Sequence, residues 1–419
     1  MITAQIIMVC TLGVMIMGIA PLYLTAAVGT TLAALAAGFP LIGSSPDSIS
    51  KLLVAAMNPV IVDMLGVLLF IGIMQKSGYM DVIIYKIMEV GRKNGGAPGI
   101  ATAAGLAAAL LGALTAFTQP VIMATIAGPA ATRLGLSANK TSAIISMANT
   151  VANNAGFTHP TMLAILGLTG IKFGLINFWG FAGSIGIYIF AYYKAKREML
   201  KEGIAIIKED DQENAFGELG ANAPSFTKAF FPFLVLCITF FMGVPVFLVG
   251  VGCGILVILM SKTNLPDGEK AMVSGVAQIA IPIVAIISLM YMSTVISKIG
   301  LVTVVAKHIG PYIAMAPIQI LLVISAIAGT ITQSNAASAP IVLPFVQIVL
   351  GLGASPLATS FAAISGCAIM QLFLSGGALT ALPVVAGVIP GTNQKIANKW
   401  QRPCMLVGLG VSFLLTFVI

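Results

Sequence analysis

Charged residues are scarce in this sequence: Asp, Glu, Lys and Arg make up only 8% of its 419 residues, whereas 58% are hydrophobic. Soluble globular domains carry roughly 25% charged residues, so the composition excludes that class. Apolar runs of about 20 residues, the length that crosses a bilayer as a helix, recur from one end of the chain to the other. The sequence therefore predicts an all-α polytopic membrane protein.

Clusters of reactive or basic side chains are also lacking. The five Cys residues are scattered through apolar segments without CxxC spacing, so neither a disulfide framework nor a metal site is expected. The net charge is +8, but the basic residues stand singly or in pairs between apolar runs. This distribution favours membrane orientation over nucleic-acid binding. We therefore expect the lipid bilayer as a partner, no nucleic acid and no organic cofactor.

The order of segments in the first half of the chain returns in the second half. Apolar spans are followed at 76–93 by an amphipathic stretch in which Ile83, Ile87 and Val90 recur at helical spacing. A similar stretch follows the apolar spans of the second half at 297–310. The repetition predicts two inverted-topology repeats. Each would contain an interfacial arm helix, a re-entrant helical hairpin and a broken transmembrane helix.

The predicted bounds follow this order. Repeat 1 covers residues 1–193, with scaffold spans within 1–75, the arm at 76–93, the hairpin at 97–132, the broken helix at 139–168 and a last span at 173–193. A cytoplasmic linker at 194–228 contains the acidic run EDDQE. Repeat 2 covers residues 229–419, with scaffold spans within 229–296, the arm at 297–310, the hairpin at 311–349, the broken helix at 355–390 and a last span at 403–419.

The basic residues predict the orientation of these segments. A hairpin at 97–132 keeps the basic residues at 92–93 and at 133–140 on one side of the membrane, as the positive-inside rule expects. The resulting topology places all but four of the 21 Lys and Arg residues on the cytoplasmic side; those four are Lys51, Lys172, Lys298 and Lys307. We therefore expect a protein of the cytoplasmic (inner) membrane with both termini outside the cytoplasm.

Two short polar elements interrupt the apolar segments that we interpret as hairpins. The first, "TAFTQP", contains Thr118 and Gln119, and the second, "TQSN", contains Thr332, Gln333, Ser334 and Asn335. Irregular backbone at membrane depth is tolerated only where protein or an aqueous cavity satisfies it. The free N–H groups of a helix end favour an anion and free carbonyls hold a cation. Both elements are therefore predicted to be hairpin tips that bound a substrate.

A broken span is expected after each hairpin. The first contains Asn149, Asn153 and Asn154, followed by Gly156 and then by His159, which Pro160 biases away from a helical conformation. Asn149 and Asn153 are four residues apart and share a helix face. The second break contains the sequence at 375–377 and Thr380. The alternative for each polar residue is a hydrogen bond that joins two transmembrane helices, and for the glycines it is close helix packing.

His159 is the only ionisable residue near the middle of a predicted span, and such residues are functional by default. Its charge can change near neutral pH, so it is a candidate proton carrier. The alternative is a neutral histidine that hydrogen-bonds to neighbouring Asn residues. No Arg or Lys is close in sequence to the tips or breaks, so no bidentate clamp for a dicarboxylate is predicted. A small monoanion fits better.

Two stretches resemble the gluconate permease family of the ion-transporter superfamily: "GFTHPTMLAI" at 156–165 and "SGGALTALPVVAGVIPGTNQKIANKW" at 375–400. The family has a Gly-Phe followed closely by Pro-His-Pro-Gly-Pro. This chain matches that pattern at Gly156, Phe157, His159 and Pro160 and departs from it at Thr158, Thr161 and Met162. The "QSNAASAP" tip is similar to the Ser-Asn-Thr motif of sodium-coupled members of the superfamily, with Ala336 in place of the threonine.

The resemblance implies a secondary transporter, usually a homodimer, with an elevator-type cycle. A scaffold built from the early spans of each half would hold a moving transport domain of hairpins and broken helices, and the arms would link the two.

We therefore interpret the sequence as a secondary transporter that couples H+ or Na+ to symport of a small organic anion, such as a sugar acid or short monocarboxylate. The predicted substrate-binding residues are Thr118, Gln119, Asn153, Asn154, His159, Thr332, Gln333, Ser334, Asn335, Ser375, Gly376, Gly377 and Thr380. The predicted ion-coupling residues are His159, Asn149, Asn153 and Asn335, with Na+ possible at Asn153 and Asn335. The alternatives are a cation/proton antiporter and a membrane-embedded enzyme; the lack of an intramembrane carboxylate pair, metal cluster or activated nucleophile argues against the enzyme.

Overall fold

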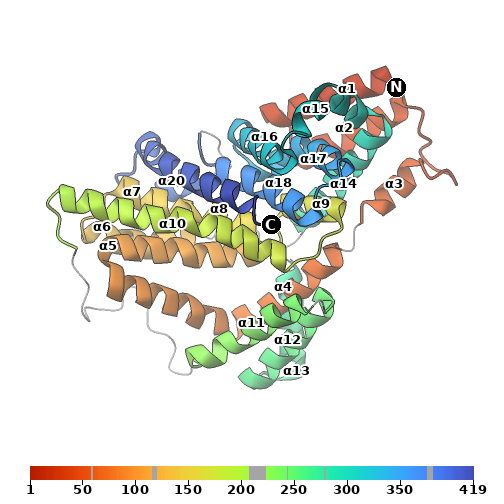
Figure 1. Ribbon diagram of the computed structural model, residues 1–419. Helices are drawn as coiled ribbons and strands as arrows, with labels where there is room; N and C mark the ends of the chain where they lie inside the picture. The colour runs from red at the N-terminus through yellow and green to blue at the C-terminus, as the bar shows by residue number, and fades with distance from the viewer. Residues whose placement is uncertain (58–59, 116–119, 207–222, 243, 278–279, 375–380) are drawn as a thin grey trace.

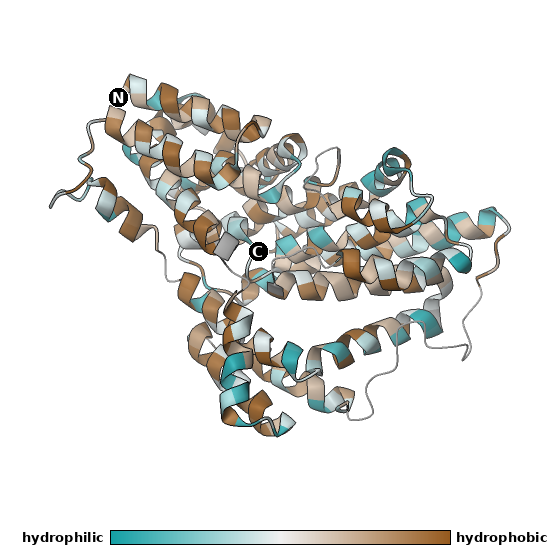
Figure 2. Cartoon of the chain, turned by 180° about the vertical axis from the view of Figure 1, so that it is seen from behind, coloured by the Kyte–Doolittle hydropathy of each residue, from teal (hydrophilic) through white to brown (hydrophobic). Residues whose placement is uncertain are grey.

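The computed structural model describes residues 1–57, 60–115, 120–206, 223–242, 244–277, 280–374 and 381–419. Within these ranges every regular secondary-structure element is a helix (Figure 1). Large apolar side chains such as Leu24 and Leu248 stay exposed on the surface of the outer helices. Hydrophobic residues, brown in Figure 2, make up much of the helices. Such a surface suits lipid rather than water. The prediction of an all-α polytopic membrane protein is confirmed.

Of the helices in the described ranges, ten belong to each half of the chain. The first half contains α1 (Ile2–Met17), α2 (Leu22–Ala36), α3 (Ile49–Ala55), α4 (Val60–Lys76), α5 (Tyr79–Thr115), α6 (Pro120–Arg133), α7 (Ala138–Ser146), α8 (Ala148–Ala155), α9 (Pro160–Thr169) and α10 (Leu175–Lys201). The second half contains α11 (Phe226–Phe241), α12 (Val246–Ser261), α13 (Leu265–Val276), α14 (Ala280–Lys298), α15 (Leu301–Ile313), α16 (Pro317–Thr332), α17 (Asn335–Gly351), α18 (Pro356–Met370), α19 (Ala381–Val388) and α20 (Gln394–Leu415).

Many of these helices are short for membrane spans. Among the described residues, two segments are long and apolar enough to cross a membrane, Gly95–Leu114 and Leu175–Lys201, or up to four if each of two bent helix pairs is one span. The bent pairs are α3 with α4 and the end of α14 with α15. Several further apolar helices have 10–17 residues. At 1.5 Å per residue such helices fall short of the ~30 Å hydrocarbon core, which local thinning of the bilayer or continuation across a break accommodates.

α5 changes direction at Gly96, where the backbone is non-helical with φ 56° and ψ −148°. Only glycine adopts this conformation without strain. The part before the bend corresponds to the predicted arm, and the part after it enters the predicted first hairpin. A Cβ on Gly99 would lie 2.4 Å from the carbonyl oxygen of Gly91, so glycines also let the chain on either side of the bend pack closely.

Helices at corresponding places of the two halves make corresponding contacts. α4 packs against α12 and α13, whereas α14 packs against α2 and α3. α9 contacts α17, and α19 contacts α6. Reciprocal contacts of this kind are what a two-fold relation between similar units produces. The two halves are therefore interlocked rather than laid side by side.

Several element bounds differ from the expected ones. The scaffold spans expected within 229–296 correspond to α11, α12, α13 and α14 in the described part of the chain. α10 continues to Lys201, eight residues into the predicted linker, and α20 begins at Gln394, well before the predicted last span at 403–419. In both extended helices the added turns carry polar residues that contact other segments, such as Glu198 and Asn398, while Arg197 and Lys399 stay exposed. Membrane orientation and the position of the termini stay predictions.

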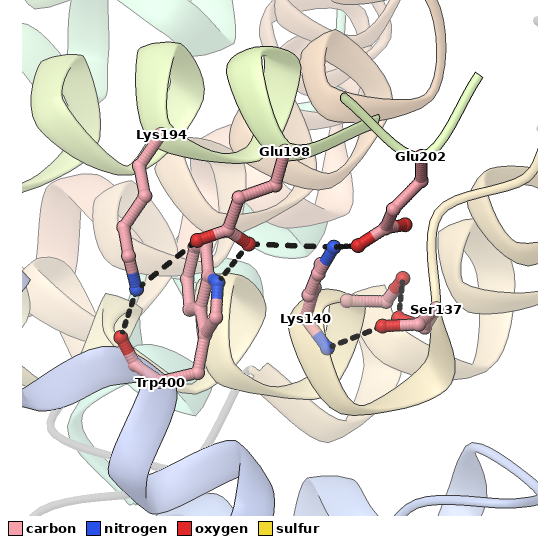
Figure 3. A network of polar contacts seen from close by, with 7 residues as sticks. Ser137, Lys140, Lys194, Glu198, Glu202 and Trp400 are labelled. Atoms are coloured by element: carbon pink, nitrogen blue, oxygen red, sulfur yellow. Dashed lines mark hydrogen bonds and ion pairs between the residues drawn. The ribbon is translucent and has the colours of Figure 1, made fainter. Parts of the chain in front are cut away.

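An ionic cluster joins the ends of α7, α10 and α20 (Figure 3). Lys140 pairs with Glu198 at 3.3 Å and with Glu202 at 2.7 Å. The indole N–H of Trp400 donates to Glu198 at 2.7 Å. Lys194 donates to the Trp400 carbonyl at 2.7 Å and lies 3.9 Å from the centroid of its ring. Glu198 is thus the centre of the cluster, and the polar turns of α10 and α20 supply most of its side chains.

Replacing Glu198 with Gln is expected to lower the thermal midpoint of the purified protein more than replacing Glu202 with Gln. The Glu198 variant loses a charged acceptor that Lys140, Lys194 and the Trp400 indole share. Hydrogen bonds to charged groups contribute about 1.5–3 kcal/mol. The Glu202 side chain is 51% exposed, and exposed ion pairs contribute about 0–1 kcal/mol. Differential scanning fluorimetry in one detergent compares the two variants. Equal midpoints would contradict the central role of Glu198.

Candidate functional site

The second predicted tip is a helix–turn–helix. α16 ends at Thr332, and Gln333 follows in the left-handed region with φ 51°. Ser334 is the N-cap of α17, and its hydroxyl accepts from the Ala337 N–H at 3.3 Å. Thr332 Oγ1 lies 2.8 Å from Ser338 Oγ across the turn. The polar run thus supplies the caps and cross-links that a chain reversal needs, and α16 and α17 pack against one another.

The first broken span separates α8 from α9 at 156–159. A Cβ on Gly156 would lie 2.3 Å from the Ala152 carbonyl oxygen, so only glycine fits. The Phe157 N–H donates to the Ala113 carbonyl at 2.8 Å, which docks the break on α5. Asn177 of α10 donates to the carbonyls of Ala155 at 3.0 Å and of Gly156 at 3.3 Å. The backbone groups freed by the break are therefore satisfied by protein.

The second tip meets the first break through Asn335, which is 2% exposed. Its side-chain amide lies 3.1 Å from His159 Nδ1. Its carbonyl accepts from Thr161 Oγ1 at 2.7 Å, and its N–H donates to Gln371 Oε1 at 3.2 Å. Asn335 therefore connects the hairpin tip, the first broken span and the end of α18, three segments from both halves of the chain.

His159 caps the N-terminus of α9 through its Nδ1 atom, which accepts from the Thr161 N–H at 3.4 Å. The Asn335 amide approaches the same nitrogen. Because a backbone N–H can only donate, Nδ1 is an acceptor and the neutral ring carries its proton on Nε2. Protonating Nδ1 would break the bond from the Thr161 N–H and require the Asn335 amide to turn its Oδ1 toward the ring, so the protonation state of His159 is tied to the hairpin tip.

Two buried oxygen atoms, one on Asn335 and one on the residue that precedes His159, have no hydrogen-bond partner among the described residues. Asn335 Oδ1 is one, and Oγ1 of Thr158, the residue before His159, is the other. Thr158 is fully buried. Leaving a buried polar atom unpaired costs about 1–3 kcal/mol, and such atoms in a native protein call for an explanation such as an ion. Oxygen atoms beside unwound transmembrane backbone are typical ligands of a coupling cation.

The three predicted asparagines of α8 are in different surroundings. Asn154 is fully engaged: its amide donates to the Gly180 carbonyl at 2.9 Å and to Ser184 Oγ at 2.7 Å, while its Oδ1 accepts from Ser365. Asn154 therefore joins α8 to α10 and α18. This is the alternative to substrate binding that the sequence left open: a hydrogen bond between transmembrane helices. Asn153 is buried and Asn149 half-buried. The side chains of these two have no hydrogen bond within the described chain.

The remaining predicted site residues belong to segments that are not described. Thr118 and Gln119 of the first tip, and Ser375, Gly376, Gly377 and Thr380 of the second break, lie outside the described residues. On the described side, Thr332, Gln333 and Ser334 form the turn that presents Asn335.

Several polar residues at the site were missed by sequence reasoning. Gln371 and Thr161 hold the Asn335 backbone. Asn398 of α20 donates to the carbonyls of Leu372 at 3.1 Å and Phe373 at 3.2 Å, where the second broken span leaves α18. It plays the part there that Asn177 plays at the first break. An amide in each of the two equivalent helices is a signal that the internal repeat could have revealed.

A basic residue that is distant in sequence contacts the start of the second break. Arg402 of α20 donates from Nε to the Phe373 carbonyl at 3.0 Å, and its guanidinium lies 5.6 Å from the centroid of the Phe373 ring. It also bonds Asn398 Oδ1 at 2.9 Å. The residue is far from the break in sequence, so only the packing of α20 brings it there. A cationic group is thus in contact with the start of the second break.

The comparisons with known proteins identify the fold. No protein-family model matches the sequence, and neither does any curated protein. Among solved structures, the fold is similar to the YdaH transporter of Alcanivorax borkumensis, with a TM-score of 0.62 and 17% identity over 87% of this chain and 85% of that one. It is also similar to Neisseria gonorrhoeae MtrF, described with a class of antimetabolite efflux pumps, with a TM-score of 0.63 and 12% identity over 95% and 94%.

At these identities the likeness shows a shared fold. It leaves the resemblance to gluconate permeases as a prediction.

Proposed function

We propose that this protein is a secondary transporter that couples a cation, with Na+ favoured, to movement of a small organic anion across the cytoplasmic membrane. The observation that carries the proposal is the contact of Asn335 with His159, together with the buried oxygens Asn335 Oδ1 and Thr158 Oγ1, which have no partner among the described residues. It lies where a hairpin tip meets a broken span. The two similar structures named above are described as carriers, one as a transporter and one among efflux pumps, and neither as an enzyme.

We infer the substrate class from the positive charge at the α17 N-terminus and at the start of the second break. The N-terminus of α17 has positive dipole character, and Arg402 adds a cation at the start of the second break. Both favour an anion. Because the Arg402 guanidinium is shared with Phe373 and Asn398, it is positioned to stabilise one carboxylate rather than to clamp two. A sugar acid or short monocarboxylate fits this arrangement, and an elevator-type cycle would carry it.

A second candidate function is exchange of the organic anion for protons. His159 favours it, because protonating Nδ1 would break its bond from the Thr161 N–H and force the Asn335 amide to turn, so a proton could loosen the hairpin tip. The direction of transport would then be outward, as the word efflux in the description of MtrF suggests for that protein.

Sodium is expected to raise the thermal midpoint of the purified protein, and Thr158→Val is expected to reduce that shift. A ligand that binds only the folded state stabilises it by RT ln(1 + [L]/Kd), or about 2.7 kcal/mol at 100 times its Kd. Potassium at equal ionic strength is the control salt. Thr30→Val is the matched control variant, because Thr30 Oγ1 is also buried and unpaired but belongs to α2.

The same measurement is then repeated with a panel of small carboxylates at two pH values. A sodium-dependent shift with one acid supports the proposal and identifies the substrate. A shift that follows pH and ignores sodium favours the proton exchanger instead. No shift with sodium, or an equal reduction in Thr158→Val and Thr30→Val, would argue against the cation site.

A further inference from the structure

An apolar groove runs between the arm part of α5, the start of α11 and the unit formed by α8, α10 and the second part of α5. It consists of two cavities of about 510 Å³ and 500 Å³ that share Ile87, Leu106, Leu110 and Phe233 in their walls. Because the cavities share these residues, the groove is elongated. Volumes of this size are typical of ligand sites, whereas protein interiors are otherwise close-packed.

One end of the groove is open and apolar. Phe178 and Phe181 of α10 line it and are 52% and 45% exposed. Exposed Phe231 and Leu234 lie on α11 beside Phe233. In a membrane protein such a surface faces hydrocarbon, so the groove can be filled from the bilayer without crossing water.

The other end of the groove is polar and basic. Lys86 and Tyr192 line it. Lys196 stands over the Tyr192 ring at 5.9 Å from its centroid. The one acidic residue of this part of the arm, Glu89, is already paired with Lys86 and Lys93 at 2.7 Å each. Hydrogen bonds from Lys86 and Lys93 lower the pKa of Glu89 to about 2, so the carboxylate is saturated by its two lysines. Counted over the described residues, this end therefore keeps an excess of positive charge.

We propose that this groove binds an anionic glycerophospholipid of the membrane, with an acyl chain along Leu106, Leu110 and Phe233 and the phosphate at Lys86 and Lys196. Its shape suits a chain, its wall suits hydrocarbon, and its basic end complements a phosphate. Basic pockets between transmembrane helices recognise anionic head groups in this way. The lipid would fill the space between two sets of helices. One is the arm part of α5 together with α11, and the other is α8, α10 and the second part of α5.

The first experiment compares phospholipid that stays bound during purification in mild detergent, by native mass spectrometry and extraction. Leu110→Trp fills the groove and is expected to lose the bound phospholipid. Leu234→Trp adds the same ring to α11 outside the groove wall, where the side chain is 44% exposed, and is expected to keep it. Leu106→Phe is a milder filling variant that serves if Leu110→Trp does not fold. Size-exclusion chromatography and thermal midpoints establish that the variants are folded and unchanged in oligomeric state.

The second experiment tests the head group with delipidated protein. Phosphatidylglycerol is expected to raise the thermal midpoint more than phosphatidylcholine does, and Lys196→Gln is expected to remove most of the difference. Equal retention of lipid in all variants would show a general lipid shell and overturn the proposal, as would a groove filled by detergent alone or by a second copy of the chain. Equal shifts with the two lipids would overturn the assignment of an anionic head group. None of these outcomes depends on the transported substrate.

Discussion

Asn335→Ala is expected to abolish sodium-dependent stabilisation and sodium-driven transport while leaving the protein folded. The substitution removes the unpaired Oδ1 and the contact with His159. The backbone bonds of residue 335 to Thr161 and Gln371 remain, so the hairpin tip keeps its position. Removing a buried oxygen that has no donor also removes its desolvation cost. The thermal midpoint without sodium is therefore expected to stay equal or rise.

The effect on sodium should be large. Losing one of the few side-chain oxygens of the site is expected to weaken the apparent sodium affinity by at least about tenfold, which corresponds to about 1.4 kcal/mol. Uptake into proteoliposomes of the carboxylate that stabilises the wild-type protein, with and without a sodium gradient, measures the functional loss. Undiminished sodium-driven uptake by Asn335→Ala would exclude Oδ1 as a ligand.

His159→Gln separates the two coupling ions. Glutamine does not titrate near neutral pH but offers an oxygen that can accept from the Thr161 N–H and the Asn335 amide. If sodium drives transport, uptake by this variant is expected to depend on the sodium gradient nearly as strongly as uptake by the wild-type protein. If His159 carries a proton, uptake or exchange driven by a pH gradient is expected to disappear while substrate still shifts the thermal midpoint.

The positions of the described tip and break could be predicted because their residues differ in type from the apolar helical residues on either side. "TQSN" is polar inside an apolar run, and the turn falls at Gln333 and Ser334. Gly156 and Pro160 bracket the end of α8 and the start of α9 in the same way. Local chemistry decides both: a glycine for the close approach, a proline at a helix start, and hydroxyl caps for freed N–H groups.

Contacts between distant segments could not be predicted in this way. Arg402 and Asn398 reach the second break only because α20 packs beside α18, and nothing near residues 372–373 indicates them. Asn154 was expected at the substrate because it follows Asn153, but its helix face turns it toward Ser184 and Ser365. A single polar residue in an apolar helix satisfies the same sequence pattern whether it binds a substrate or a neighbouring helix.

The contacts that interlock the two halves also could not be predicted from the sequence, although the sequence contains the glycines that make them. A Cβ on Gly250 of α12 would lie 2.0 Å from the Gly66 carbonyl oxygen of α4, and one on Gly275 would lie 2.1 Å from the Leu68 carbonyl oxygen. The backbones of α4, α12 and α13 therefore touch with no side chain between them. Glycine spacing alone does not say which helix approaches, since Gly252 on the same helix as Gly250 faces open space.

Gly250→Ala is expected to destabilise the protein strongly, whereas Gly252→Ala is expected to be neutral or stabilising. Both changes add one methyl group to α12, and in an exposed helix alanine is favoured over glycine by about 1 kcal/mol. At Gly252 that preference is all that changes, because no atom lies within 4 Å of the new Cβ. At Gly250 the methyl group meets backbone rather than a flexible side chain, so α4 and α12 must separate; overpacking costs typically about 1–3 kcal/mol and more where backbone must move.

The difference between the two glycine variants is measured as thermal midpoint and as the yield of monodisperse protein after extraction. A large fall for Gly250→Ala beside an unchanged Gly252→Ala would establish that contact between α4 and α12 is a rigid joint between the two halves. Equal midpoints would mean that these helices are spaced more widely in the membrane than the close approach of Gly66 and Gly250 requires. In that case α4 and α12 could slide past one another, and the joint would have to be sought at α14 and α2 instead.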